Sequence, residues 1–126
     1  MDLYLLDSSV ILDILDGNEH GREAARILGP AEACTSVICR CEVLNKVNLQ
    51  KITKAKELLS KIPVFGLTTG DGETAEQLQY SCRKTGVHTQ TLDCLIAATA
   101  VNNYATVLTS DADFERIQQV EKIVLK

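Results

Sequence analysis

Five acidic side chains lie beside apolar stretches of this sequence: Asp7, Glu42, Asp93, Asp111 and Asp113. The first and the last two closely follow short apolar runs, and the other two interrupt apolar ones. Burying an unpaired carboxylate costs several kcal/mol or forces it to take up a proton. A hard divalent cation removes that cost, because it binds carboxylate oxygens and in turn polarises water or phosphate. These residues are therefore candidate ligands of a divalent metal ion.

Each acid also has an ordinary structural explanation. Asp7 and Asp111 could cap the helical turns that follow them. Asp93 stands near the start of a predicted helix, where the helix dipole favours an acid without any metal. Glu42 could pair with a basic residue two positions before it or four after it. Taken singly, these explanations suffice, but a metal site accounts better for all of the acids if they converge.

The elements that must position these acids alternate between strand and helix. Short apolar runs predict strands at residues 3–6, 33–35, 64–67, 105–109 and 122–125. Amphipathic segments predict helices at 19–28, 36–49, 53–61, 73–85 and 90–102, with a helical turn at 111–117. The run at 10–15 is too short to predict a helix, and 68–72 predicts a glycine-rich turn.

This alternation predicts right-handed crossovers and a mostly parallel sheet covered on both faces. The expected fold class is α/β, a three-layer α/β/α sandwich. In such sheets, sites form beyond the carboxyl ends of the strands. Asp7 and Asp111 come just after two predicted strands, so both are expected at that edge of the sheet.

Length and composition indicate one ordinary globular domain covering residues 1–126, with 45% apolar and 24% charged residues. No basic and apolar signal segment follows Met1, and no apolar run is long enough to span a bilayer, so we expect a cytoplasmic protein with no membrane contact. The five cysteines are odd in number and lack zinc-ligand spacing, which predicts reduced, buried thiols.

Charge is unevenly distributed along the chain. The formal net charge is −4, yet residues 46–61 hold five lysines and one glutamate, so that stretch carries +4 and the remainder −8. Such a strip can attract phosphate locally, although a solvated helix face is the simpler explanation of any one lysine run. Candidate contacts to phosphate are Lys46, Lys51 and Lys54 within this strip and Arg40 before it.

Four segments resemble the motifs of the PIN domain family, in the family's order: residues 5–13, 36–44, 92–100 and 108–114. The likeness covers nearly the whole chain and is greatest to small stand-alone members, the VapC toxins. It implies that Asp7, Glu42, Asp93 and Asp111 are the metal-site acids, with Asp113 auxiliary. Ser8 and Thr109 would orient a carboxylate or a water molecule. The run Cys39-Arg40-Cys41 before Glu42 departs from the family pattern.

The resemblance implies an endoribonuclease that hydrolyses RNA with Mg²⁺ or Mn²⁺, the toxin of a toxin–antitoxin pair. It also implies a homodimer and a cognate antitoxin that covers the acidic groove. No histidine or cysteine is expected to converge on the site, which favours these hard ions over zinc. Two alternatives stay open: an RNA-processing nuclease without an antitoxin, and a non-catalytic module that binds metal, RNA or protein.

Overall fold

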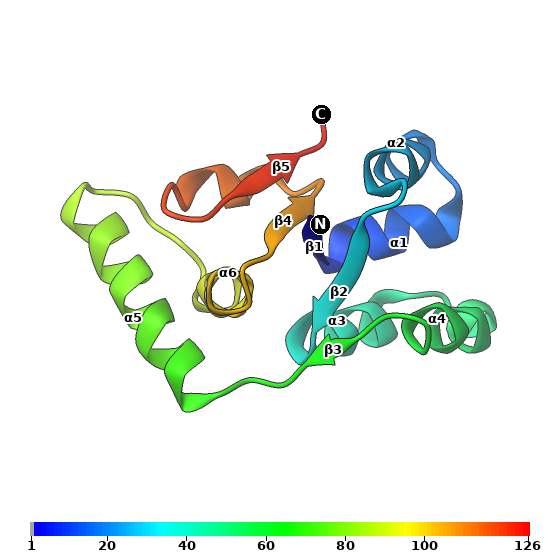
Figure 1. Ribbon diagram of the computed structural model, residues 1–126, viewed down its shortest axis with the longest axis horizontal. Helices are drawn as coiled ribbons and strands as arrows, with labels where there is room; N and C mark the ends of the chain where they lie inside the picture. Colours follow the sequence, from blue (N-terminus) through cyan, green and yellow to red (C-terminus); the bar gives the residue numbers. More distant parts are fainter. Residues whose placement is uncertain (1) are drawn as a thin grey trace.

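A five-stranded parallel sheet runs through the middle of the molecule, with its strands in the order β3-β2-β1-β4-β5 (Figure 1). The computed structural model describes residues 2–126. The strands are β1 (Leu3–Leu6), β2 (Glu32–Ser36), β3 (Val64–Phe65), β4 (Thr106–Thr109) and β5 (Lys122–Val124). Every neighbouring pair is parallel. The predicted strands are therefore confirmed, with ends that differ by at most two residues.

Helices cover both faces of this sheet. One face carries α1 (Ser8–Asp16), α2 (Glu19–Leu28), α3 (Val37–Lys46), the short 3₁₀ helix η1 (Leu49–Lys51) and α4 (Ile52–Leu59). The other carries α5 (Thr69–Lys84), α6 (Thr91–Asn102) and η2 (Ala112–Arg116), a second 3₁₀ helix. None of the helices between residues 2 and 126 is both long and apolar enough to cross a membrane.

Two hydrophobic cores fill the space between these layers. Successive side chains of a strand point to opposite faces, so Leu5 joins the core under α5 and α6, whereas Leu6 joins the core under α1 and α4. In Figure 1 the sheet separates the first four helices from α5 and α6. The predicted α/β/α sandwich is confirmed, and its sheet is entirely parallel.

The first helix is a correction to the sequence prediction, which left residues 10–15 without one. α1 begins directly after β1 and buries Val10, Ile11 and Leu15, which lie on one side at helical spacing. It ends at Gly17, whose φ of 66° is left-handed and unfavourable for other residues. Because the helix starts at the strand end, its first turn lies at the edge of the sheet where sites form.

The predicted glycine-rich turn at 68–72 is also wrong, because α5 begins inside it. Thr68 Oγ1 accepts a hydrogen bond from Asp71 N, and Asp71 Oδ2 accepts one from Thr68 N, both at 3.0 Å. This reciprocal capping box offsets the poor helix propensity of Gly70 and Gly72. Asn102 Nδ2 donates to the same Asp71 at 2.8 Å and ties the start of α5 to the end of α6.

α3 ends three residues before the end of the helix predicted at 36–49. Ser36 caps the helix, since its hydroxyl accepts from Cys39 N at 3.1 Å. The helix ends at Lys46, and its buried residues are Cys39 and Val43. All five cysteines are free, and only Cys41 is exposed, contrary to the prediction that every thiol is buried. Cys39 lies on the side of α3 that faces the end of β1.

Candidate metal centre

The predicted acids converge at the carboxyl edge of the sheet, where they form two adjoining groups. In each group the possible ligand atoms all lie within 4.8 Å of one another. The first group is Asp7, Cys39 and Glu42, and the second is Asp93, Asp111 and Asp113. The residues follow the ends of β1 and β4 or lie on α3, α6 and η2. Of the expected ligands, none is displaced from this edge.

Asp7 is buried and firmly held by hydroxyl groups. Its Oδ2 accepts hydrogen bonds from Ser9 Oγ and Thr109 Oγ1, both at 2.8 Å. Parallel pairing of β1 with β4 sets Leu6 beside Leu108, which brings Asp7 and Thr109 together although they are 102 residues apart. Asp7 is the N-cap residue of α1 but makes no side-chain cap bond, so helix capping does not explain it.

Glu42 is oriented from α1. Ser8 Oγ donates to Glu42 Oε1 at 3.2 Å, so the hydroxyl predicted to support the site does contact one of its acids. Within residues 2–126, Glu42 forms no ion pair with Arg40 or Lys46. The ordinary explanation of Glu42 as half of a helical ion pair therefore fails.

Asp111 serves a structural role as well as lying in the cluster. Its Oδ1 accepts from Asp113 N at 2.9 Å and caps η2, as one ordinary explanation required. Its own backbone N donates to Thr109 Oγ1 at 2.9 Å. One hydroxyl, that of Thr109, therefore contacts both Asp7 and the backbone of Asp111. Asp113 is exposed and lies 4.0 Å from Arg116.

The pKa of Asp93 reflects its burial and the negative charge of the acids around it. Its pKa is raised from 3.8 to about 6, first by burial and then by repulsion from Asp7, Asp111, Glu42 and Asp113, in that order. No lysine or arginine between residues 2 and 126 forms an ion pair with Asp93, Asp7, Glu42 or Asp111. The cluster thus holds negative charge that the protein itself leaves uncompensated.

Carboxylate oxygens in this number fit a hard divalent cation such as Mg²⁺ or Mn²⁺. One finding corrects the sequence prediction, because a cysteine does converge on the site: Cys39 Sγ lies 3.8 Å from Asp7 Oδ1. Cys39 precedes Glu42 by one helical turn, so both face the end of β1. Burial raises the pKa of its thiol to about 12, and a neutral thiol is a poor metal ligand. The oxygen-donor character of the site is therefore retained.

The predicted basic residues lie outside the cluster. Lys51 pairs with Asp16 at 3.1 Å. In the chain from residue 2 onward, Arg40, Lys46 and Lys54 form no ion pair at all. The two lysines among these three are exposed, and Arg40 is half-buried.

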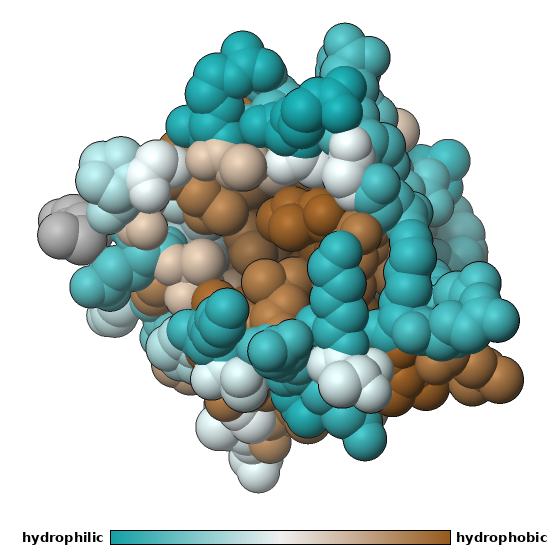
Figure 2. All heavy atoms as spheres, turned by 90° about the vertical axis from the view of Figure 1, so that its right-hand side faces the viewer, coloured by the Kyte–Doolittle hydropathy of each residue, from teal (hydrophilic) through white to brown (hydrophobic). Residues whose placement is uncertain are grey.

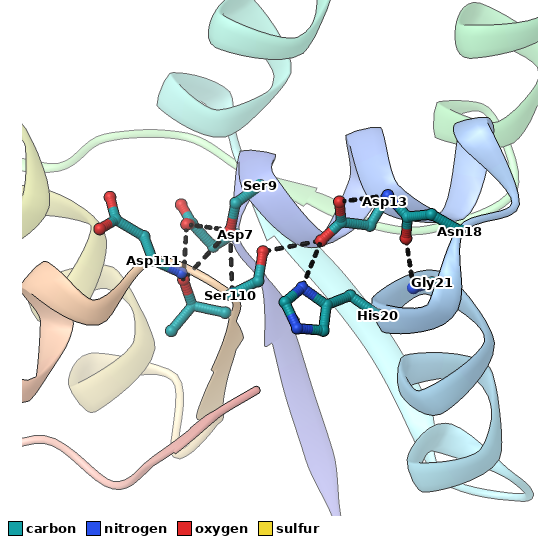
Figure 3. A network of polar contacts seen from close by, with 9 residues as sticks. Asp7, Ser9, Asp13, Asn18, His20, Gly21, Ser110 and Asp111 are labelled. Atoms are coloured by element: carbon teal, nitrogen blue, oxygen red, sulfur yellow. Dashed lines mark hydrogen bonds and ion pairs between the residues drawn. The ribbon is translucent and has the colours of Figure 1, made fainter. Parts of the chain in front are cut away.

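Two serines that the sequence prediction missed complete the hydroxyl network around Asp7. Ser9 Oγ donates to Asp7 and lies 3.2 Å from Thr109 Oγ1, and Ser110 N donates to Ser9 Oγ at 3.1 Å (Figure 3). The hydroxyl residues at the ends of the first and fourth predicted strands are the signal in the sequence. Its meaning depended on the pairing of β1 with β4, which local sequence does not specify.

The family model of the PIN domain matches residues 4–120, and the chain belongs to this family. Among proteins of curated function, no sequence matches the chain. Solved structures share the fold at low identity. The chain is similar to one in the DNA-bound VapBC of Salmonella typhimurium, with a TM-score of 0.80 and 22% identity over 98% of each chain.

Two further structures show the same fold. One is VapBC2 from Rickettsia felis bound to a promoter DNA fragment, with a TM-score of 0.78 and 17% identity over 98% of this chain and 99% of that one. The other is VapBC-5, a toxin–antitoxin system of Mycobacterium tuberculosis, with a TM-score of 0.74 and 21% identity over 99% of this chain and 100% of that one. The chain is thus a PIN domain that resembles the VapC toxins of such systems.

Proposed function

We propose that the chain, as a single domain over residues 1–126, is an endoribonuclease that hydrolyses RNA with Mg²⁺ or Mn²⁺ and is the toxin of a toxin–antitoxin pair. The observation that supports this most directly is the state of Asp93: burial and four neighbouring carboxylates raise its pKa, and it has no basic partner among residues 2–126. In a PIN domain, that uncompensated charge fits a cation that binds phosphate.

The residues have distinct roles in this proposal. Asp7 and Asp93 would hold the ion, and Glu42 and Asp111 would orient water or hold a second ion. Asp113 is auxiliary, because it is exposed and near Arg116. When bound, the ion lowers the pKa of the attacking water and neutralises charge on the leaving oxygen.

The hydroxyl groups keep the carboxylates ready for that ion. Thr109 and Ser9 direct Asp7 Oδ2, and Ser8 directs Glu42 Oε1, so these oxygens need little rearrangement when a cation binds. Asp7 is 4% exposed, so its own carboxylate is shielded from bulk water. Preorganised carboxylates of this kind set the direction from which water meets a bound phosphate.

Basic side chains near the acidic cluster are candidates for contact with RNA. Lys46 follows Glu42 by one turn of α3, so both lie on the same side of that helix, and Arg40 is on the same helix. Lys46 and Arg40 are available, together with Lys54, because none of the three is engaged in an ion pair within residues 2–126. We assign Arg40, Lys46 and Lys54 to phosphate contacts, and Lys51 to a weaker one because Asp16 holds it.

A protein partner is supported by an apolar hollow on another side of the molecule. Figure 2 shows it rimmed by hydrophilic side chains, on the side formed by α1, α2 and α4. A hollow of about 210 Å³ there is lined by Ile14, Leu15 and Leu58, with Lys54, Glu57 and Lys61 around them. Similar chains were crystallised as VapBC complexes, and we propose that a cognate antitoxin covers this hollow and the acidic groove, and that the toxin is a homodimer.

The test is cleavage of a mixed cellular RNA pool in Mg²⁺, Mn²⁺ or EDTA by the wild type, Asp7→Asn and Asp93→Asn. Both substitutions remove charge at nearly constant volume, and circular dichroism checks their folding. Asp16→Asn is the matched control, since Asp16 is an exposed acid outside the cluster. We expect cleavage that needs metal, falls at least 100-fold in both site variants and persists in the control.

Other outcomes decide between the alternatives. Absence of cleavage by folded, metal-binding protein supports a non-catalytic module that holds a metal ion. Equal cleavage by the wild type and both site variants contradicts the residue assignments. Co-purification of a small DNA-binding protein encoded beside this chain supports the toxin, whereas its absence with cleavage retained supports an RNA-processing nuclease.

A further inference from the structure

Asp13 on α1 lies outside the acidic cluster, yet three polar groups converge on its carboxylate. Ser110 Oγ donates to Oδ2 at 2.7 Å, Asn18 Nδ2 donates to Oδ1 at 2.9 Å, and His20 Nδ1 lies 3.8 Å from Oδ2 (Figure 3). The Asp13 side chain is only 18% exposed. A carboxylate held by so many groups at the surface of a small domain needs an explanation that the metal cluster does not supply.

The turn from α1 to α2 explains two of these three contacts. Asn18 caps α2 by accepting from Gly21 N at 2.9 Å, which directs its amide nitrogen toward Asp13. A Cβ at Gly21 would lie 2.3 Å from the carbonyl oxygen of Asp13, so only glycine lets α2 approach α1 this closely. This approach sets Asn18 and His20 over Asp13 and fixes the carboxylate on one side.

The third contact leads to the metal centre. Ser110 stands between Thr109, which donates to Asp7, and Asp111, which belongs to the cluster. Its backbone N donates to Ser9 Oγ at 3.1 Å, and its side chain donates to Asp13. The loop after β4 is therefore tied to α1 at Ser110 by both backbone and side chain. In Figure 3, Asp111 and Asp13 lie on opposite sides of that residue.

We propose that Asp13 is a positioning residue of the metal centre, which acts through Ser110 to hold Asp111 where a cation binds. The inference rests on the proposed function, because it assumes that Asp111 contributes to metal binding. The 2.7 Å bond is charge-assisted, and such bonds are stronger than those between neutral groups. Mutation of a residue that hydrogen-bonds to a metal ligand typically changes metal affinity by about 10- to 100-fold. Asp13 acts through one more residue, Ser110, so its effect should be smaller.

Titration of Mn²⁺ into the full chain by calorimetry tests this role. We expect Asp13→Ala and Ser110→Ala each to weaken Mn²⁺ binding by about 5- to 10-fold, and the double variant to be no weaker than either. Asp13→Asn keeps an oxygen acceptor for Ser110 and should stay within about twofold of the wild type. Asp16→Ala removes the same charge from the same helix without touching Ser110, and should also stay within about twofold.

A purely structural or purely electrostatic role for Asp13 gives different results. Additive losses in the double variant, or equal losses in Asp13→Ala and Asp13→Asn, would overturn the proposal. A second measurement needs no metal: amide hydrogen exchange at Ser110 and Asp111 should quicken in Asp13→Ala and stay slow in Asp13→Asn. Unchanged exchange in Asp13→Ala contradicts positioning even if the wild type binds no Mn²⁺, whereas failure of the wild type to bind Mn²⁺ contradicts only the proposed function.

Discussion

The two halves of the acidic cluster differ in how their carboxylates are held. Asp7 is buried and accepts two hydroxyl hydrogen bonds, and Glu42 beside it accepts a third from Ser8. Asp93 is only partly buried, and no group between residues 2 and 126 donates a hydrogen bond to its side chain, while its pKa is raised by every acid around it. Hydroxyl groups of the protein therefore hold Asp7 and Glu42, whereas the charge of Asp93 has no basic partner among residues 2–126.

This difference separates two requirements of a metal site. Rigid placement comes from donors that satisfy a carboxylate without neutralising it, as Thr109 and Ser9 do for Asp7. Affinity comes from negative charge that folding leaves uncompensated, as at Asp93. Removal of Asp7 should therefore lower the stability of the metal-free protein, whereas removal of Asp93 should not, although both substitutions weaken metal binding.

The largest expected effect is on the stability of the metal-free protein. Asp7→Ala leaves the hydroxyls of Ser9 and Thr109 without their acceptor and opens a buried space, which should cost roughly 2–3 kcal/mol of unfolding free energy. Asp93→Ala removes a repelled charge and should change that free energy by less than about 0.5 kcal/mol, or raise it. Urea denaturation in EDTA at pH 7.5 measures both. Equal destabilisation by the two variants would show that the halves are held alike.

Thr109 joins the two halves, and its removal should affect both. Thr109→Val keeps the shape but leaves Asp7 with one hydroxyl donor fewer and Asp111 N without an acceptor, at a cost of roughly 1–2 kcal/mol. It should also weaken Mn²⁺ binding by about 10-fold. Thr99→Val is the matched control: Thr99 is buried and donates to the carbonyl of Leu95, away from the acids. Similar stability loss in both, with altered metal binding only in Thr109→Val, is the expected result.

Local sequence predicted the acids and the strands, because both depend on short-range patterns. Apolar runs that end in Asp7 and shortly before Asp111 are visible without any tertiary information. The start of α5 was missed, because a capping box at Thr68 and Asp71 outweighs two glycines whose ordinary preference is a turn. What the sequence could not show was contact between distant segments.

Three features of the site illustrate this limit. Thr109 was predicted to orient a carboxylate or a water molecule, but the sequence did not show which one. Its partner is Asp7, because β1 pairs with β4. The position of Cys39 beside Asp7 depends on how α3 packs against the end of β1. The link from Asp13 to Ser110 requires α1 to lie beside the loop after β4. Each arises from tertiary packing, which side-chain type and spacing do not encode.

A smaller effect follows from the pKa of Asp93. Its value of about 6 in the folded, metal-free protein exceeds the 3.8 expected when unfolded, so the folded state binds the proton more tightly. The group therefore lowers stability progressively as pH rises from about 4 to about 6, by about 1 kcal/mol after allowance for solvent screening. Melting temperatures in EDTA should show this fall, and Asp93→Asn should lack it.

Metal provides the control for that pH dependence. In saturating Mn²⁺, a cation that binds the ionised carboxylate should reverse the trend, so that melting temperature rises between pH 4 and pH 6. Asp16→Asn should follow the wild type in both conditions, because Asp16 is an exposed acid paired with Lys51. A wild-type curve in EDTA that coincides with that of Asp93→Asn would contradict the raised pKa.

The smallest expected effect distinguishes the two acids that follow β4. Asp113 is exposed and lies 4.0 Å from Arg116, so its charge is screened by water and by a neighbouring cation. Asp113→Asn should therefore weaken Mn²⁺ binding by less than about threefold, whereas Asp111→Asn should weaken it by about 10-fold. Calorimetric titration of both variants measures the difference. If the two losses were equal, the loop after β4 would supply two metal ligands, and the exposed Asp113 would belong to the metal site as fully as Asp111 does.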